Sequence, residues 1–297
     1  LSSIWLLLND GHGSFTPGTR RDVGLSLISL TAADLDGDAN QDLAATDAAL
    51  ASVWTLYNKG DGTFDDAVSF PVAAPPNSLV AVDLDQDGDA DLAVAEGSRS
   101  DEPGSLGSVS VLRNQGEGRF DLAAHVPVGS PAHSITSADL DGDNRVDLAV
   151  ANSGIFGYAL YEGSGVSVLR NRGGLGFEPP VRFAIGDSQT GLGAADFDGD
   201  ARIDLATTNF WGDHDTTATY GSISVLFNQT LAPVSLDVNL NEITDECETR
   251  FHRGDPNSSG PTDISDGIAI FGYLFLGDPA PTCLESADAT NDGKIDI

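Results

Sequence analysis

Aspartate recurs in fixed phase in four ten-residue segments of this chain. The segments are DLDGDANQDL (34–43), DLDQDGDADL (83–92), DLDGDNRVDL (139–148) and DFDGDARIDL (196–205). Each places aspartate at positions 1, 3, 5 and 9, and alternating side chains in a tight loop converge on one point. Oxygen ligands around one point at about 2.3–2.6 Å suit Ca²⁺. The pattern predicts a calcium-binding loop in each segment, four in all.

Four carboxylates and the backbone carbonyl at position 7 are the predicted ligands of each loop. They are Asp34, Asp36, Asp38, Asn40 and Asp42; Asp83, Asp85, Asp87, Asp89 and Asp91; Asp139, Asp141, Asp143, Arg145 and Asp147; and Asp196, Asp198, Asp200, Arg202 and Asp204. Carboxylates this close repel one another or take up protons unless a cation lies among them. We therefore expect folding to be coupled to Ca²⁺.

Two alternatives to Ca²⁺ remain open at this stage. The aspartates could form Asx turns between strands, although turn chemistry alone does not require four carboxylates in fixed phase four times. Mg²⁺ is the second alternative, and it prefers to retain water. Helix-loop-helix EF-hands are disfavoured, because position 12 is Ala45, Val94, Val150 or Thr207 where an EF-hand needs a bidentate glutamate. Position 6, often glycine in such loops, is Ala39, Gly88, Asn144 or Ala201.

The C-terminal quarter contains further loops of the same chemistry. Segment 255–266 offers Asp255, Asn257, Ser259, Asp263 and Asp266, and segment 288–297 offers Asp288, Thr290, Asp292 and Asp296. Segment 237–248 has Asp237, Asn239, Asn241, Asp245 and Glu248 at ligand spacing. Between the two better loops, GIAIFGYLFLGDP has apolar residues on one helical face and a Gly-Asp-Pro stop. We expect a small helical module with calcium loops there.

Short apolar runs must position the four aspartate loops. SVWTLYN, SVSVLRN, GVSVLRN and SISVLFN are rich in β-branched residues, and LAAT, LAVA, LAVA and LATT follow the loops. A second motif alternates with the loops: NDGHGSF (9–15), NKGDGTF (58–64), NQGEGRF (114–120) and NRGGLGF (171–177). The unit repeats about every fifty residues and supplies about four strands, as a propeller blade does. IWLLLN at the N-terminus is expected to be the closing strand of a blade.

The alternation of the two motifs over residues 1 to about 230 resembles the FG-GAP or VCBS repeats of integrin alpha-subunit propellers and many secreted bacterial proteins. This resemblance implies a mainly β fold that forms a partial propeller of about four four-stranded blades. Members of the family commonly form a closed ring of seven blades. The loops around 255–266 and 288–297 resemble a dockerin type I domain. Dockerins pair with cohesins through loop positions 10 and 11, where this chain has Ile264 and Ser265 in the first loop.

These observations divide the chain into three parts. Residues 1–232 are the predicted propeller repeats, 233–250 a linker that holds one calcium-loop pattern, and 251–297 the dockerin-like module. The chain contains no methionine, so we expect it to be a piece of a longer or processed polypeptide, cut within a domain at both ends. Cys247 and Cys283 are expected to form a disulfide or remain as buried thiols.

Composition excludes several functional classes. The chain has 14 Lys and Arg against 46 Asp and Glu, a formal net charge of −32. Such a surface repels nucleic acid and anionic lipid, and no apolar run is long enough for a membrane helix. Acids outside the loops, such as Glu96, form no recognisable catalytic constellation.

The sequence predicts a non-enzymatic, extracellular, Ca²⁺-binding module for protein or glycan recognition. We expect it to be attached to a partner through the dockerin-like end and to carry its binding specificity in loops 96–107, 152–165 and 209–220. The alternative is an accessory region of a larger secreted hydrolase.

Overall fold

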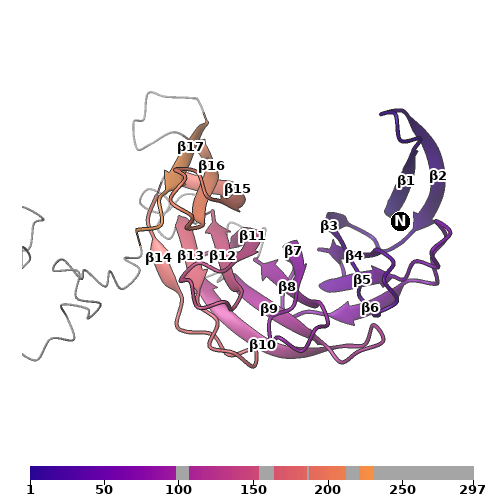
Figure 1. The fold of residues 1–297 in the computed structure, drawn as a ribbon, viewed down its shortest axis with the longest axis horizontal. Helices are drawn as coiled ribbons and strands as arrows, with labels where there is room; N and C mark the ends of the chain where they lie inside the picture. Colours follow the sequence, from indigo (N-terminus) through magenta and orange to yellow (C-terminus); the bar gives the residue numbers. More distant parts are fainter. Residues whose placement is uncertain (98–106, 154–163, 186, 212–220, 230–297) are drawn as a thin grey trace, which may run out of the picture. The chain divides into compact units, whose positions relative to one another are not determined.

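The computed structural model describes residues 1–97, 107–153, 164–185, 187–211 and 221–229, which form β-strands joined by turns and loops (Figure 1). The strands are β1 (Ser3–Asn9), β2 (Phe15–Asp22), β3 (Leu27–Ala33), β4 (Asp42–Asp47), β5 (Ser52–Leu56), β6 (Val68–Pro71), β7 (Pro76–Val82), β8 (Asp91–Glu96), β9 (Gly107–Asn114), β10 (Phe120–Gly129), β11 (Ala132–Ala138), β12 (Asp147–Asn152), β13 (Gly165–Leu169), β14 (Val181–Phe183), β15 (Asp187–Ala195), β16 (Asp204–Trp211) and β17 (Ser222–Leu226). Across these ranges no helix reaches the length and apolar character that crossing a membrane requires.

Each repeat unit folds into its own antiparallel sheet, with strands in sequence order. The sheets are β3-β4-β5-β6, β7-β8-β9-β10, β11-β12-β13-β14 and β15-β16-β17, preceded by the hairpin β1-β2. The predicted mainly β fold is therefore confirmed. Three units have the predicted four strands, and the fourth has three within the described residues. The arrangement of these sheets as part of a propeller stays a prediction.

The LAVA-type runs are strands buried on both faces. In β8, Leu92 and Val94 pack toward the preceding sheet, while Ala93 and Ala95 pack toward the following one. All four side chains are fully buried. Both faces of a strand between two neighbouring sheets are removed from water, so its sequence is continuously apolar instead of alternating.

In the described residues the hydrophobic core consists of four clusters, one at each junction between consecutive sheets. The clusters join β1-β2 to β3-β6, β3-β6 to β7-β10, β7-β10 to β11-β14, and β11-β14 to β15-β17. The first strands of consecutive sheets also contact one another: β3 contacts β7, β7 contacts β11, and β11 contacts β15. Each sheet is thus stabilised by its neighbours, as expected for a repeat architecture.

The N-terminal strand differs from its predicted place. We expected residues 4–9 to close a blade, but β1 pairs with a further strand, β2, through the NDGHGSF turn. The equivalent turns connect the third strand of a sheet to the fourth, as β9 connects to β10. β1 therefore occupies the third position and β2 the last, because the Asn-Gly turn chemistry directs the chain back into the same sheet.

The two terminal sheets expose apolar faces that inner sheets bury. Counted from the turn asparagine, Ile223 occupies the place of Val109, and Leu7 occupies the place of Leu112. Ile223 is 72% exposed and Leu7 61%, whereas Val109 and Leu112 are buried between sheets. Within the described residues, each terminal sheet has a neighbouring sheet on one face only.

Candidate metal centre

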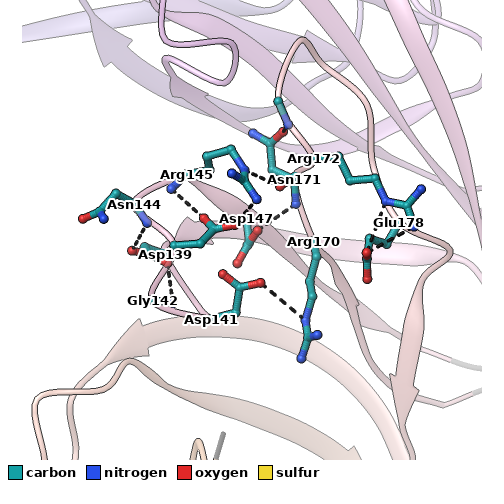
Figure 2. A network of polar contacts seen from close by, with 12 residues as sticks. Asp139, Asp141, Gly142, Asn144, Arg145, Asp147, Arg170, Asn171, Arg172 and Glu178 are labelled. Carbon is teal, nitrogen blue, oxygen red and sulfur yellow. Dashed lines mark hydrogen bonds and ion pairs between the residues drawn. The ribbon is translucent and has the colours of Figure 1, made fainter. Parts of the chain in front are cut away.

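Each aspartate loop connects the first strand of a sheet to the second. The third loop, between β11 and β12, is typical (Figure 2). Its position-9 residue, Asp147, is the first residue of β12. The following turn, which begins at Asn171, lies beside the loop because strands 1–2 and 3–4 of a sheet are joined at the same end.

The position-1 aspartate organises the backbone of the loop. Asp139 Oδ1 accepts a hydrogen bond from Gly142 N at 2.8 Å, and Oδ2 accepts one from Asn144 N at 2.9 Å. The same two bonds, from the N–H groups at positions 4 and 6, recur at Asp34, Asp83 and Asp196. Part of the aspartate pattern is therefore Asx-turn chemistry, the alternative that the sequence left open.

The position-9 aspartate is a buried clamp. Asp147 is fully buried; its Oδ2 accepts from Leu140 N at 3.0 Å and its Oδ1 accepts from Asn171 N at 2.8 Å. The equivalent pairs of bonds occur at Asp42, Asp91 and Asp204. This carboxylate joins the aspartate loop to the turn of its own sheet, and hydrogen bonds to a charged acceptor are strong.

The turn asparagine links one sheet to the preceding one. Asn171 Nδ2 donates to Val146 O at 3.0 Å in its own sheet and to Leu84 O at 2.7 Å in the loop of the preceding sheet. Asn114 and Asn228 repeat this pair of bonds toward Leu35 and Leu140. The sequence pattern marked these asparagines only as turn residues, since a carbonyl 87 residues away cannot be inferred from local spacing.

Position 6 adopts the left-handed backbone conformation whatever its residue type. Its φ is 69° at Ala39, 97° at Gly88, 65° at Asn144 and 68° at Ala201. The three non-glycine residues thus share the geometry of the glycine-containing loop. Ala39 and Ala201 carry the cost of a Cβ in this region, roughly 1–2 kcal/mol, whereas asparagine adopts the left-handed conformation more readily.

Ala201→Gly is therefore expected to stabilise the protein by up to about 1 kcal/mol, because relief of the Cβ cost at positive φ, roughly 1–2 kcal/mol, exceeds the extra backbone entropy that glycine loses on folding, about 0.5–1 kcal/mol. The converse change, Gly199→Ala, is expected to destabilise by about 1 kcal/mol. A Cβ at Gly199 meets no atom within 4 Å at φ +84°, so its cost is purely conformational. Urea denaturation of both variants measures the effects, and two changes of the same sign would contradict this reading.

Three carboxylates gather in every loop. One oxygen from each of three aspartates lies within 4.8 Å of the others in the sets Asp34, Asp36 and Asp38; Asp83, Asp85 and Asp91; Asp139, Asp141 and Asp147; and Asp196, Asp198 and Asp204. Positions 1, 3 and 9 thus meet in the last three loops. Position 5 joins the set only in the first loop, where position 9 does not.

Two oxygens of these sets are buried without a hydrogen-bond partner. They are Asp85 Oδ1 and Asp141 Oδ1. The Asp85 side chain is only 7% exposed. A carboxylate oxygen removed from water without a donor is costly, and a hard cation would satisfy it. The residues present therefore fit a divalent cation bound through oxygen.

Burial and mutual repulsion shift the acids of the loops. Burial, and to a smaller extent the charges of Asp85 and Asp87, raises the pKa of Asp91 to about 6, although N–H donors oppose the shift. Burial also raises the pKa of Asp147 and of Asp36. In contrast, backbone N–H donors lower the pKa of the solvent-exposed Asp196. Negative charge is therefore unfavourable at the buried positions and favourable at the rim.

Arginines contact three of the loops. Arg113 Nη2 lies 3.0 Å from Asp85 Oδ2 and 3.4 Å from Asp87 Oδ2. At position 7, Arg145 and Arg202 pair with the position-5 aspartates Asp143 and Asp200. Position 7 was predicted to contribute only its backbone carbonyl, so this side-chain role was missed.

The remaining predicted sites lie outside the described residues. These are the loop patterns at 237–248, 255–266 and 288–297, the helical dockerin-like module, and Cys247 with Cys283.

Comparisons with known proteins agree with the repeat pattern in part of the chain. Residues 34–94, which include the first two aspartate loops, match the FG-GAP-like repeat family. A search of curated proteins finds no match. Among solved structures, the crystal structure of the V. cholerae biofilm matrix protein Bap1 aligns with a TM-score of 0.30 and 16% identity. The alignment covers 56% of this chain and 30% of that chain.

Proposed function

We propose that this chain is a non-catalytic extracellular module. Its aspartate loops bind Ca²⁺, and the ends of its sheets that lie opposite these loops recognise a protein or glycan. The observation that carries the calcium assignment is the buried, unpartnered Asp85 Oδ1 within a set of three converging carboxylates. In the second loop, Asp83, Asp85 and Asp91 would hold the ion. Ca²⁺ would neutralise charge that burial makes unfavourable at Asp91.

Calorimetric titration of chelator-treated protein with Ca²⁺ tests this assignment. We expect saturable binding of several ions, and Asp85→Ala is expected to remove one. Asp121→Ala, an exposed acid in β10 of the same sheet, is the matched control and should leave the stoichiometry unchanged. Titration with Mg²⁺ distinguishes the two cations, because Mg²⁺ retains water and binds such cages weakly. A flat calcium isotherm would refute the assignment.

Recognition is assigned to the ends of the sheets opposite the aspartate loops. The connections between second and third strands leave from these ends, at residues 97–106, 153–164 and 212–221, whereas the first sheet has the short turn 48–51. Connections presented by a rigid scaffold are common binding sites. Replacing each connection by a short turn should abolish capture of glycans or cells on an array while calcium binding persists. Unchanged capture would contradict this assignment.

The surroundings of Glu96 support the non-catalytic part of the proposal. Glu96 is fully buried; Oε1 accepts from Ala73 N at 3.0 Å and Oε2 from Ser108 Oγ at 2.8 Å. His125 Nδ1 faces both Ser110 Oγ, at 3.4 Å, and Glu96 Oε2, at 3.6 Å. A serine–histidine–acid relay needs the hydroxyl and the acid at opposite ring nitrogens. Ser110, His125 and Glu96 are therefore not arranged as such a relay, and the contacts of Glu96 are structural.

Attachment to a partner through the dockerin-like residues 251–297 is a further part of the proposal.

A further inference from the structure

The position-5 carboxylate has different partners in different loops. In the third loop, Arg145 Nε donates to Asn171 O at 2.8 Å (Figure 2). Arg145 Nη2 also pairs with Asp143, so the guanidinium is held at two points. Arg202 makes the same two contacts in the fourth loop, with Asp200 and Asn228 O. A guanidinium fixed in this way holds the position-5 carboxylate away from the centre of the loop.

The second loop obtains its arginine from another strand. Its position-7 residue is Asp89, and the guanidinium comes from Arg113 at the end of β9, which contacts Asp85 and Asp87. The equivalent residue in the third sheet, Arg170, lies 3.8 Å from Asp141 Oδ2. In the second, third and fourth loops the position-5 aspartate is thus paired with arginine, and it is absent from the converging set of carboxylates.

The first loop has neutral residues at both places. Position 7 is Asn40, whose Nδ2 donates to Asp38 Oδ2 at 2.7 Å, and the residue equivalent to Arg113 is Tyr57. In the described part of the chain, no lysine or arginine forms an ion pair with a carboxylate of this loop. Here Asp38 does belong to the converging set, together with Asp34 and Asp36.

We propose that arginine side chains grade the calcium affinity of the four loops, so that the arginine-free first loop binds Ca²⁺ most tightly. This inference rests on the proposed calcium binding. A guanidinium repels the incoming ion and occupies an oxygen that would otherwise be a ligand. A unit charge several ångströms away in a partly buried, well-screened site is expected to weaken ion binding by about tenfold. The third loop, with both Arg145 and Arg170, is the weakest.

Reciprocal substitutions between loops test the inference. Arg145→Asn and Arg202→Asn give the third and fourth loops the residue of the first, and each is expected to raise calcium affinity at its own loop by about tenfold. Asn40→Arg is expected to lower affinity at the first loop by a similar factor. Arg119→Asn, which removes an exposed arginine paired with Glu117 in a turn, is the matched control and should change neither.

Terbium luminescence assigns the tightest site to a loop. Tyr57 precedes Asn58, whose N–H donates to Asp42 Oδ1 at 2.7 Å, so the tyrosine lies beside the first loop. At the lowest Tb³⁺ concentrations we expect luminescence that is sensitised through Tyr57. Ca²⁺ should displace the bound Tb³⁺ and remove this luminescence. The Tyr57→Phe variant should lack it.

The outcomes separate this inference from the proposed function. If the wild type binds the ion but Arg145→Asn, Arg202→Asn and Asn40→Arg leave the affinities unchanged, the grading is wrong. The proposal that the loops bind Ca²⁺ would then still stand. Absence of binding in the wild type and in every variant would overturn both. A gain of affinity in Arg145→Asn cannot result from misfolding, so the inference remains testable even if Asn40→Arg fails to fold.

Discussion

Replacing Asp147 with alanine is expected to lower the free energy of unfolding by about 2–5 kcal/mol. The side chain is fully buried, and its two oxygens accept the N–H groups of Leu140 and Asn171. Alanine leaves both donors unsatisfied in the interior and separates the aspartate loop from the turn. Relief of the desolvation that raises the pKa of Asp147 offsets part of this loss. Urea denaturation in excess chelator isolates the effect from any bound ion.

Asp143→Ala is the matched control for this prediction. Asp143 belongs to the same loop, but it is partly exposed and paired with Arg145, so its removal should cost about 1 kcal/mol or less. Asp147→Asn retains one acceptor and should give an intermediate loss. If Asp147→Ala were as stable in chelator as Asp143→Ala, the clamp would not hold the loop as described.

Replacing Asn171 with alanine is expected to destabilise the protein by roughly 2–4 kcal/mol. Its Nδ2 donates to Leu84 O in the preceding sheet and to Val146 O in its own, and its Oδ1 accepts from Gly173 N at 2.8 Å. The loss removes a direct link between neighbouring sheets and leaves the buried carbonyl of Leu84 without this donor. Native-state hydrogen exchange should show that the junction between sheet β7–β10 and sheet β11–β14 opens faster in the variant than in the wild type.

The matched control is Asn58→Ala, at the same place in the first sheet. Asn58 Nδ2 donates at 3.1 Å to Gln41 O of its own sheet, so its loss should be about 1 kcal/mol. Equal losses at Asn58 and Asn171 would show that the inter-sheet bond contributes little.

The strands and loops could be predicted from sequence because their signals are local. Apolar runs such as LAVA, with asparagine–glycine turns between them, are sufficient to define strands that pack between neighbours. The aspartate phase likewise identifies the loops. Spacing alone does not tell which carboxylate accepts N–H groups and which faces a cation. Asp139 and Asp147 are largely satisfied by the backbone, whereas Asp141 Oδ1 is not.

The parts that sequence reasoning missed depend on contacts between distant segments. The position-7 arginines read as variable residues, because their pairing with position 5 requires the loop to be folded. The inter-sheet bonds of Asn114 and Asn171 reach loops of the preceding repeat. The place of β1 as a third strand was missed because β2, FTPGTRRD, is polar and mostly exposed, so it lacks the apolar signal of a buried strand.

Thermal unfolding of the wild-type chain in saturating Ca²⁺ and in excess chelator tests the central claim most directly. We expect a higher melting temperature in Ca²⁺, by roughly 5–10 °C for each site when the free Ca²⁺ concentration is about a hundredfold above the Kd of that site. The rise should be smaller in Asp85→Ala than in Asp121→Ala. Superimposable unfolding curves in Ca²⁺ and chelator would contradict the claim that the converging carboxylates bind an ion.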